Sequence, residues 1–248
     1  MNKKNIAILI LVIVLVAGAY VLYLQRSAIL NATHKIASTN KSQQTPTISV
    51  QDKKITDNTK PFKIDITYPS FSGADDLNKK IADFVNSQIS DFKTNSLEND
   101  SAVKKIDPVS YAKYPREYDL TIGYDKGIVD ENTISTVLEV YSFTGGAHGA
   151  TTFISFNYNP KTKTEIKLAD LFTGQPDYLK TISDFSIKYL TGQIDPQMLD
   201  KSWLNTGAGP VAENFSVFLI NKDNITFYIQ QYQVAAGAAG EFKVVFPK

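Results

Sequence analysis

Residues 133–143 read TISTVLEVYSF and residues 151–158 read TTFISFNY, and these two segments decide the fold. Both are rich in β-branched and aromatic residues, which favour strands. A glycine-rich loop separates them, with the sequence Gly145-Gly146-Ala147-His148-Gly149. Three glycines within five residues permit positive φ angles or a close approach of two backbones. The pattern therefore predicts a strand, a glycine loop and a partner strand.

More strands are predicted on both sides of this pair. Apolar side chains alternate with polar ones in residues 62–68 and 118–124, which is typical of half-buried strands. Residues 125–127 (Asp-Lys-Gly) are predicted to form a turn. Three further strands are predicted towards the C-terminus, at residues 215–220, 225–233 and 242–246.

Two segments have helical spacing instead. Apolar residues from Leu77 to Phe92 recur every three or four positions, which predicts a helix that ends near Asn95 and is followed by a connection. A second amphipathic helix is predicted over residues 177–191, with residues 192–212 irregular. The order of elements predicts an α+β fold, in which antiparallel β-sheets pack with two main amphipathic helices.

The N-terminal residues predict a membrane anchor. Residues 6–24, IAILILVIVLVAGAYVLYL, contain no charged side chain, and a helix of this length spans about 28 Å, close to the ~30 Å hydrocarbon core of a bilayer. Lys3 and Lys4 precede the segment and favour a cytoplasmic N-terminus. We therefore expect one transmembrane helix within residues 1–26. The alternative is a cleaved signal peptide, because Ala17-Gly18-Ala19 fits a cleavage site.

The rest of the chain divides into a linker and a domain. Residues 27–60 are rich in Ser, Thr, Asn, Gln and Lys, which predicts a flexible polar linker. Residues 61–248 are predicted to form an extracytoplasmic domain, either as one body or as two subdomains over 61–125 and 126–248. This region holds 18 Lys/Arg and 23 Asp/Glu, and a mildly acidic domain gives no indication of nucleic-acid binding.

Few residues are suited to catalysis. The chain has no cysteine, and His148 is the one histidine of residues 61–248, while His34 lies in the linker. A zinc site needs three or four His, Cys or carboxylate ligands, and a Ser–His–acid triad would have to use His148. We therefore predict no catalytic residue, metal site or cofactor, and expect a protein that is not an enzyme. A carboxylate pair remains an alternative, because a glycosidase needs only two acidic residues.

Two features are candidates for binding. The first is the glycine loop, with the candidate residues Gly145, Gly146, His148 and Gly149. In a structural role, His148 would bond a neighbouring carbonyl group and fix the loop. In the alternative, the loop binds a ligand. The second is Trp203, the single tryptophan of the chain. A lone tryptophan is either a core residue or a surface anchor for a ligand.

Two groups of segments together resemble a known exported domain. The first group is YSFTGGAHG at 141–149, FNY at 156–158 and IKLADLF at 166–172. The second group follows in order and comprises residues 215–217, 225–228, 232–235, 238–240 and 244–247. Over residues 61–248 the chain resembles the exported domain of the RsiV anti-sigma-factor family, which also precedes the catalytic domain of PdaC-like peptidoglycan deacetylases.

The resemblance implies an α+β domain that recognises a ligand at the cell envelope, which is lysozyme in RsiV-like proteins. A sigma-binding segment is not expected, because the predicted topology leaves only Met1–Asn5 inside, and no His-x-x-x-His motif of a deacetylase occurs. We therefore expect a membrane-anchored, non-catalytic module that binds a peptidoglycan component or a protein such as lysozyme. The alternatives are a carboxylate-dependent cell-wall hydrolase and a scaffold subunit of an envelope complex.

Overall fold

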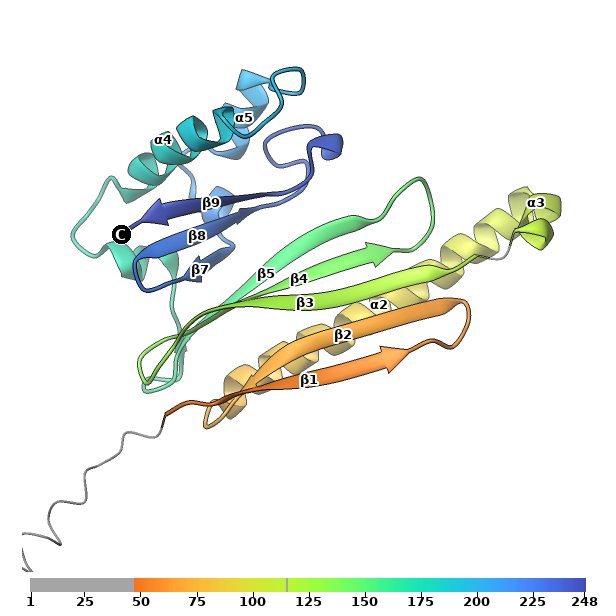
Figure 1. Cartoon of the computed structure of the whole chain (residues 1–248), viewed down its shortest axis with the longest axis horizontal. Coiled ribbons are helices and arrows are strands. Elements are labelled where there is room, and N and C mark those ends of the chain that lie inside the picture. Colours follow the sequence, from red (N-terminus) through yellow and green to blue (C-terminus); the bar gives the residue numbers. More distant parts are fainter. Residues whose placement is uncertain (1–46, 115) are drawn as a thin grey trace, which may run out of the picture. The chain divides into compact units, whose positions relative to one another are not determined.

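Two β-sheets form the centre of the part of the chain that the computed structural model describes, residues 47–114 and 116–248 (Figure 1). The large sheet has the strand order β1-β2-β3-β4-β5-β6. Its strands are β1 (Val50–Asp57), β2 (Phe62–Phe71), β3 (Tyr118–Val129), β4 (Ile134–Phe143), β5 (Ala150–Asn159) and β6 (Thr164–Glu165). All neighbours pair antiparallel except β2 and β3, which are parallel. A parallel pair needs a long crossover, and helix α2 (Asp75–Ile106) supplies it.

The small sheet follows in the C-terminal part of the chain. Its antiparallel strands have the order β7-β8-β9, with β7 at Phe218–Ile220, β8 at Asn224–Ile229 and β9 at Phe242–Pro247. The remaining helices are α3 (Pro108–Lys113), α4 (Tyr178–Thr191) and α5 (Lys201–Gly207), and the 3₁₀ turns are η1 (Leu168–Phe172), η2 (Ala212–Phe215) and η3 (Gly237–Ala239). The mixed α+β architecture with antiparallel-rich sheets is therefore as predicted.

Each sheet has its own core. Buried residues of α2, including Leu77 and Ile81, pack against Ile64 and Ile66 of β2 in one apolar cluster. The small sheet and α4 share a second cluster, which is larger. A third, smaller cluster lies between the sheets, and its buried members are Val137, Phe153, Leu219 and Tyr228. Helix α2 therefore packs on the large sheet and α4 on the small sheet, and Figure 1 shows α2 passing behind β2 and β3.

A buried polar network joins the two sheets. Asn157 of β5 donates from Nδ2 to the carbonyl oxygen of Phe218 on β7, at 2.9 Å. Ser135 of β4 donates to Oδ1 of Asn157 at 2.6 Å, and its hydroxyl accepts from the backbone N–H of Ile220 at 2.7 Å. Both side chains are buried, so the bonds replace water that neither group can reach.

A side chain closes the outer edge of β5. β6 pairs only with Tyr158 and Asn159, and the preceding stretch of an edge strand would offer unpaired backbone groups to another chain. The amide of Gln230 fills this place. The backbone N–H of Phe153 donates to Oε1 of Gln230 at 3.0 Å, and Nε2 of Gln230 donates back to the carbonyl oxygen of Phe153 at 2.9 Å.

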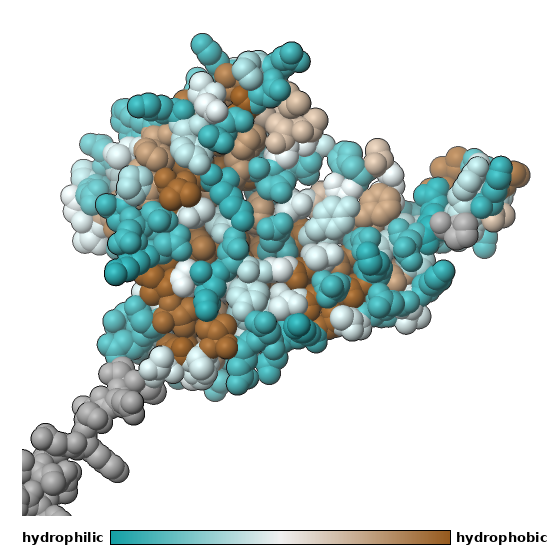
Figure 2. Space-filling view, in the orientation of Figure 1, coloured by the Kyte–Doolittle hydropathy of each residue, from teal (hydrophilic) through white to brown (hydrophobic). Residues whose placement is uncertain are grey.

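The far end of α2 carries exposed apolar side chains. Ile106 is 83% exposed, and brown side chains gather at this tip in Figure 2. The tip is fixed to the sheet through Asp100, which accepts from the hydroxyl groups of Tyr111 at 2.6 Å and Tyr118 at 2.8 Å. α3 therefore packs on the end of α2 although α3 buries no residue of its own.

The linker prediction is wrong for residues 50–57, because β1 lies there. Strand β1 reads VQDKKITD and is mostly exposed, so it lacks the apolar alternation that marks a half-buried strand. Its pairing with β2 provides the backbone hydrogen bonds that its composition does not predict. The predicted anchor and cleavage site, with residues 27–46, lie outside the described residues. Among the residues described, no helix has the length and apolar character needed to cross a membrane.

Several boundaries also differ from the predictions. α2 continues past Asn95 to Ile106, and α3 occupies part of the expected connection. The last turn of α2 carries Lys104 and Lys105, which suit the helix dipole, and its apolar residue Ile106 is exposed rather than buried. α5 lies in the stretch 192–212 that was expected to be irregular. The C-terminal elements keep their predicted order, and α4 matches the predicted helix within one residue.

The predicted turn at residues 125–127 is wrong as well. β3 runs on to Val129, and the chain turns where the N–H of Asp130 donates to the carbonyl oxygen of Thr133. The alternative subdomain boundary between 125 and 126 would therefore cut a strand. A Cβ atom at Gly127 would overlap the carbonyl oxygen of Ile220, so this glycine permits the close approach of β3 to the small sheet rather than a turn.

Strand β1 contributes to the pH dependence of the stability of the protein. Asp57 lies 2.8 Å from Nζ of Lys93 on α2, and this hydrogen bond, with others from Thr59, lowers the pKa of Asp57 to about 2. A lowered pKa means that the stabilisation is present above the ordinary value near 4 and is lost as the pH falls through the folded value. We expect the melting-temperature difference between the parent chain and Asp57→Asn to shrink between pH 4 and pH 2.

The matched control is Asp83→Asn, since Asp83 pairs with Lys79 on the exposed face of α2 alone. Exposed pairs within one helix contribute little, so this variant should stay close to the parent throughout. A constant difference for Asp57→Asn from pH 6 to pH 2 would contradict the assigned role of β1.

Candidate functional site

A hollow of about 240 Å³ lies on the face of the large sheet that α2 does not cover. Leu120, Ile122 and Leu138 belong to the core with α2, and successive strand residues point to opposite faces. The intervening residues of β3 and β4 therefore face the other way. The hollow is lined by Thr121, Gly123, Tyr124, Asp125, Glu139 and Tyr141.

Two of these residues lie opposite each other in the sheet. Gly123 of β3 is the register partner of Glu139 on β4, and a Cβ atom at Gly123 would meet no other atom within 4 Å. The floor of the hollow is thus bare backbone at this point. The carboxylate of Glu139 forms no hydrogen bond or ion pair with any residue in the described ranges, so its oxygen atoms are available to a ligand.

Asp125 differs from Glu139 because its carboxylate is already bonded. The hydroxyl of Tyr228 and Nζ of Lys243 donate to it at 2.6 and 2.8 Å. Partial burial would raise the pKa of Asp125, but the hydrogen bonds from Lys243 and Tyr228 outweigh that effect and lower it. Burial, and then the bond to Asp125, raises the pKa of Tyr228. Asp125 is therefore a fixed anion whose donors come from the small sheet.

Tyr141 forms the aromatic side of the hollow and is 39% exposed. Its ring packs against Gly149 of the glycine loop, where a Cβ atom would lie 2.5 Å from the ring. Only glycine allows this contact, since real Cβ atoms do not approach so closely. Gly149 thus leaves room for the Tyr141 ring in this orientation.

The other loop residues have conformational roles. Gly145 and Gly146 have φ angles of 109° and 101°, which side chains other than hydrogen disfavour. Nδ1 of His148 lies 2.8 Å from the carbonyl oxygen of Gly149, so the expected bond from this histidine to a neighbouring carbonyl is present. Asn99 of α2 also donates to the carbonyl oxygen of Thr144 at 3.0 Å. The loop therefore supports the hollow from its rim.

Trp203 lies on the surface rather than in a core. The side chain is on α5 and is 40% exposed. Its Nε1 donates to the carbonyl oxygen of Tyr232 at 3.0 Å, and Tyr232 is itself exposed. The interpretation as a core residue is therefore not supported, and the surface position fits the alternative. No described residue links Trp203 directly to the glycine loop.

Sequence reasoning missed Glu139 and Tyr141 as site residues. One signal was available, because Glu139 is the single charged residue within 133–143, and charged residues are rare in buried strands. The position of Glu139 next to Asp125 depends on the register of β3 and β4, which cannot be read from the sequence.

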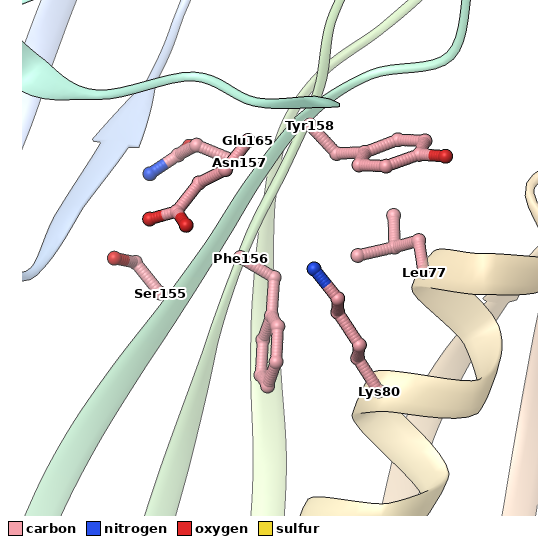
Figure 3. A pocket seen from close by; sticks show the side chains of 7 residues that line it. All are labelled: Leu77, Lys80, Ser155, Phe156, Asn157, Tyr158 and Glu165. Carbon is pink, nitrogen blue, oxygen red and sulfur yellow. The ribbon is translucent and has the colours of Figure 1, made fainter. Parts of the chain in front are cut away.

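Two other hollows are weaker candidates. A hollow of about 180 Å³ lies beside β5, and its charged residues are Lys80 of α2 and Glu165 of β6. Figure 3 shows Lys80 with Phe156 on one side of β5 and Glu165 on the other, so the two charges do not converge. A larger hollow of about 450 Å³ adjoins α4 and β9, but its wall is mainly apolar core residues such as Phe172 and Phe246.

Comparisons with known proteins give two partial matches to family models. Residues 55–151 match the family model described as Deacetylase PdaC. Residues 169–248 match the family model described as Protein of unknown function (DUF3298). The first match covers most of the large sheet, and the second covers the small sheet with its helices. The predicted likeness to PdaC-like proteins is confirmed, whereas the comparisons do not show the RsiV assignment.

Two individual relatives also match part of the chain. The peptidoglycan-N-acetylmuramic acid deacetylase PdaC of Bacillus subtilis (strain 168) is 28% identical over 189 residues, which cover 76% of this chain and 38% of the relative. The chain thus spans well under half the length of that enzyme. The immunogenic protein MPT64 of Mycobacterium tuberculosis is 28% identical over 160 residues, covering 62% of this chain and 68% of the relative.

A solved structure supports the fold. A DUF3298 family member from Bacteroides fragilis superposes with a TM-score of 0.54 at 18% identity, covering 81% of this chain and 90% of the other. At this identity the likeness concerns the fold alone.

Proposed function

We propose that this chain is an extracytoplasmic module that binds the glycan of peptidoglycan in the hollow on the large sheet. The observation that carries the proposal is the pairing of an exposed aromatic ring, Tyr141, with a free carboxylate, Glu139, beside the bare backbone of Gly123. A sugar ring presents an apolar C–H face and an edge of hydroxyl donors, which these groups complement. The relative named as a peptidoglycan deacetylase supports the same ligand class.

Each residue of the hollow would have its own role in binding. Tyr141, whose ring lies against Gly149, would pack against the C–H face of a sugar. Glu139 would accept hydrogen bonds from hydroxyl groups, and a hydrogen bond to a charged group is stronger than one between neutral groups. Asp125, already bonded to Tyr228 and Lys243, would keep the small sheet in place behind the ligand. Residues 6–24 would hold the module at the membrane near its wall ligand.

The test is co-sedimentation of the full chain, purified in detergent, with insoluble peptidoglycan. Glu139→Gln removes the charge but keeps the shape, and Tyr141→Ala removes the ring. We expect each to weaken binding at least about tenfold, which corresponds to about 1.4 kcal/mol. The matched control is Tyr114→Ala, because Tyr114 is an exposed tyrosine outside the hollow, at the end of α3, and this variant should bind as the parent does.

Saturable binding of all variants with equal affinity would overturn the assignment of the hollow, and no saturable binding by the parent would overturn the function itself. The same assay with immobilised lysozyme separates a protein ligand from a glycan. Binding to lysozyme alone, sensitive to the same substitutions, would assign the hollow to a protein partner instead.

A carboxylate-dependent hydrolase is the second candidate, because Asp125 and Glu139 line the same hollow. Glycoside hydrolysis needs one carboxyl group that is protonated as the general acid. The lowered pKa of Asp125 suits an anion rather than a proton donor. Release of reducing ends from peptidoglycan, abolished by Glu139→Gln, would establish the hydrolase in place of the binding module.

A further inference from the structure

A second aromatic surface is built from α5 and the turn after β8. Trp203 and Tyr232 are 40% and 52% exposed, and the indole Nε1–H donates to the backbone of Tyr232. Asp200 caps α5 by accepting from the backbone N–H groups of Ser202 and Trp203. The position of Trp203 is thus set by both its backbone and its side chain.

The conformation of Tyr232 is strained. Its φ angle is 68°, in the left-handed region that non-glycine residues rarely adopt. The tyrosine ring lies directly over Gly237, where a Cβ atom would overlap it. Gln231 donates to the carbonyl oxygen of Gly237 at 2.8 Å, which holds the two sides of the turn together. Strain that the surroundings impose in this way is typical of functional sites.

Gln233 fixes the same turn to α5. Its Nε2 donates to the carbonyl oxygens of Gly207 at 2.8 Å and Asn214 at 2.9 Å. Its Oε1 accepts from the backbone N–H of Gln230 at 2.9 Å. The aromatic pair is therefore rigid before any ligand arrives, which lowers the entropy lost on binding.

A short path of bonded residues connects the hollow to the pair. Glu139 is the register partner of Phe153, and Gln230 bonds the outer side of Phe153 as a further strand would. Adjacent strands are about 4.8 Å apart, so the side-chain amide of Gln230 lies about 10 Å from the backbone of Glu139. Tyr232 follows Gln230 by two residues. Phe153 itself is buried between the sheets. Two residues span at most about 7 Å, so the backbone of Tyr232 lies within that distance of Gln230.

We infer that Trp203 and Tyr232 form a second subsite that stacks a sugar ring of the same glycan, so that the module binds an oligosaccharide and not a single sugar. This inference rests on the proposed function. Both rings offer flat apolar faces with a polar edge, which is the complement of a pyranose ring. The short path of bonded residues from the hollow to the pair favours one extended ligand over two separate ones.

Chain-length dependence tests this subsite, with oligomers of N-acetylglucosamine as soluble probes of the glycan. We expect the hexamer to bind the parent chain about tenfold more tightly than the dimer, because it reaches both sites. Trp203 is the single tryptophan, so its fluorescence reports this subsite alone. Its emission should change saturably with the hexamer.

Two variants isolate the pair. Trp203→Ala and Tyr232→Gly should each lose the tenfold advantage of the hexamer while keeping the affinity for the dimer. Glycine at 232 retains the positive φ angle without strain, so this variant removes the ring without disturbing the turn. Glu139→Gln should weaken both oligomers, and Tyr114→Ala should weaken neither.

The outcomes separate the two proposals. A parent chain that binds no oligomer and no peptidoglycan would overturn the proposed function. Binding that is equal for dimer and hexamer, or a hexamer affinity that Tyr232→Gly leaves unchanged, would overturn the second subsite alone. A constant Trp203 emission at saturating hexamer would do the same, and it needs no variant.

Discussion

A chain carrying Gly207→Ala is expected to lose about 3 kcal/mol or more of its free energy of unfolding. Gly207 ends α5, and a Cβ atom there would overlap the carbonyl oxygen of Gln233 and lie 2.7 Å from its carbonyl carbon. The neighbour is backbone and cannot rotate away. The turn after β8 would have to move, which would break the two hydrogen bonds that Gln233 donates and the bond from Trp203.

Urea unfolding followed by Trp203 fluorescence measures this loss. The matched control is Gly192→Ala, because Gly192 also ends a helix and has a φ angle of −86°. A Cβ atom there would have the carbonyl oxygen of Tyr189 as its nearest neighbour, at 3.5 Å. That variant should stay within about 0.5 kcal/mol of the parent. A loss below 1 kcal/mol for Gly207→Ala would contradict the close approach of α5 to the turn.

Asn157→Leu is expected to cost about 2 to 4 kcal/mol. Leucine is close to asparagine in shape, but it leaves the carbonyl oxygen of Phe218 without its donor and the hydroxyl of Ser135 without its acceptor. Both groups are buried between the sheets, where water does not replace the lost partners. The free energy of unfolding in urea, with the m-value checked for change, measures the effect.

Ser155→Ala on the same strand is the control. Ser155 also points towards the small sheet, but its bond to the carbonyl oxygen of Ser216 is long, at 3.4 Å, and exposed. Its loss should cost less than about 0.5 kcal/mol. In the double variant Ser135→Ala/Asn157→Leu the two costs should not add, because the residues share one network. Additive costs would show that the network does not act as a unit.

Prediction from the sequence succeeds where burial imposes a period. β2, β3 and α4 each bury mainly one face, so their apolar residues recur at the spacing of a strand or a helix. β1 buries little and is held by backbone pairing with β2, which leaves no mark in its composition. The last turns of α2 lack an apolar stripe for the same reason.

The candidate site is less predictable than the fold. Its two carboxylates come from different strands, and only the register that pairs Gly123 with Glu139 brings Asp125 close to Glu139. Because the domain is rich in acidic residues, no pair stands out in the sequence. The glycine loop was visible, but its partner Tyr141 was not, because the contact with Gly149 depends on how the loop folds back.

The closure of β5 by Gln230 has a consequence for the newly made chain. Phe153 and Gln230 are 77 residues apart, and translation at about 5 to 20 residues per second needs roughly 4 to 15 seconds to make that stretch. The strands of the large sheet are all complete before the stretch ends, because they follow one another in the sequence. During that interval the edge of β5 has no cover, so the growing chain depends on the timely arrival of a single glutamine to avoid pairing with a neighbour.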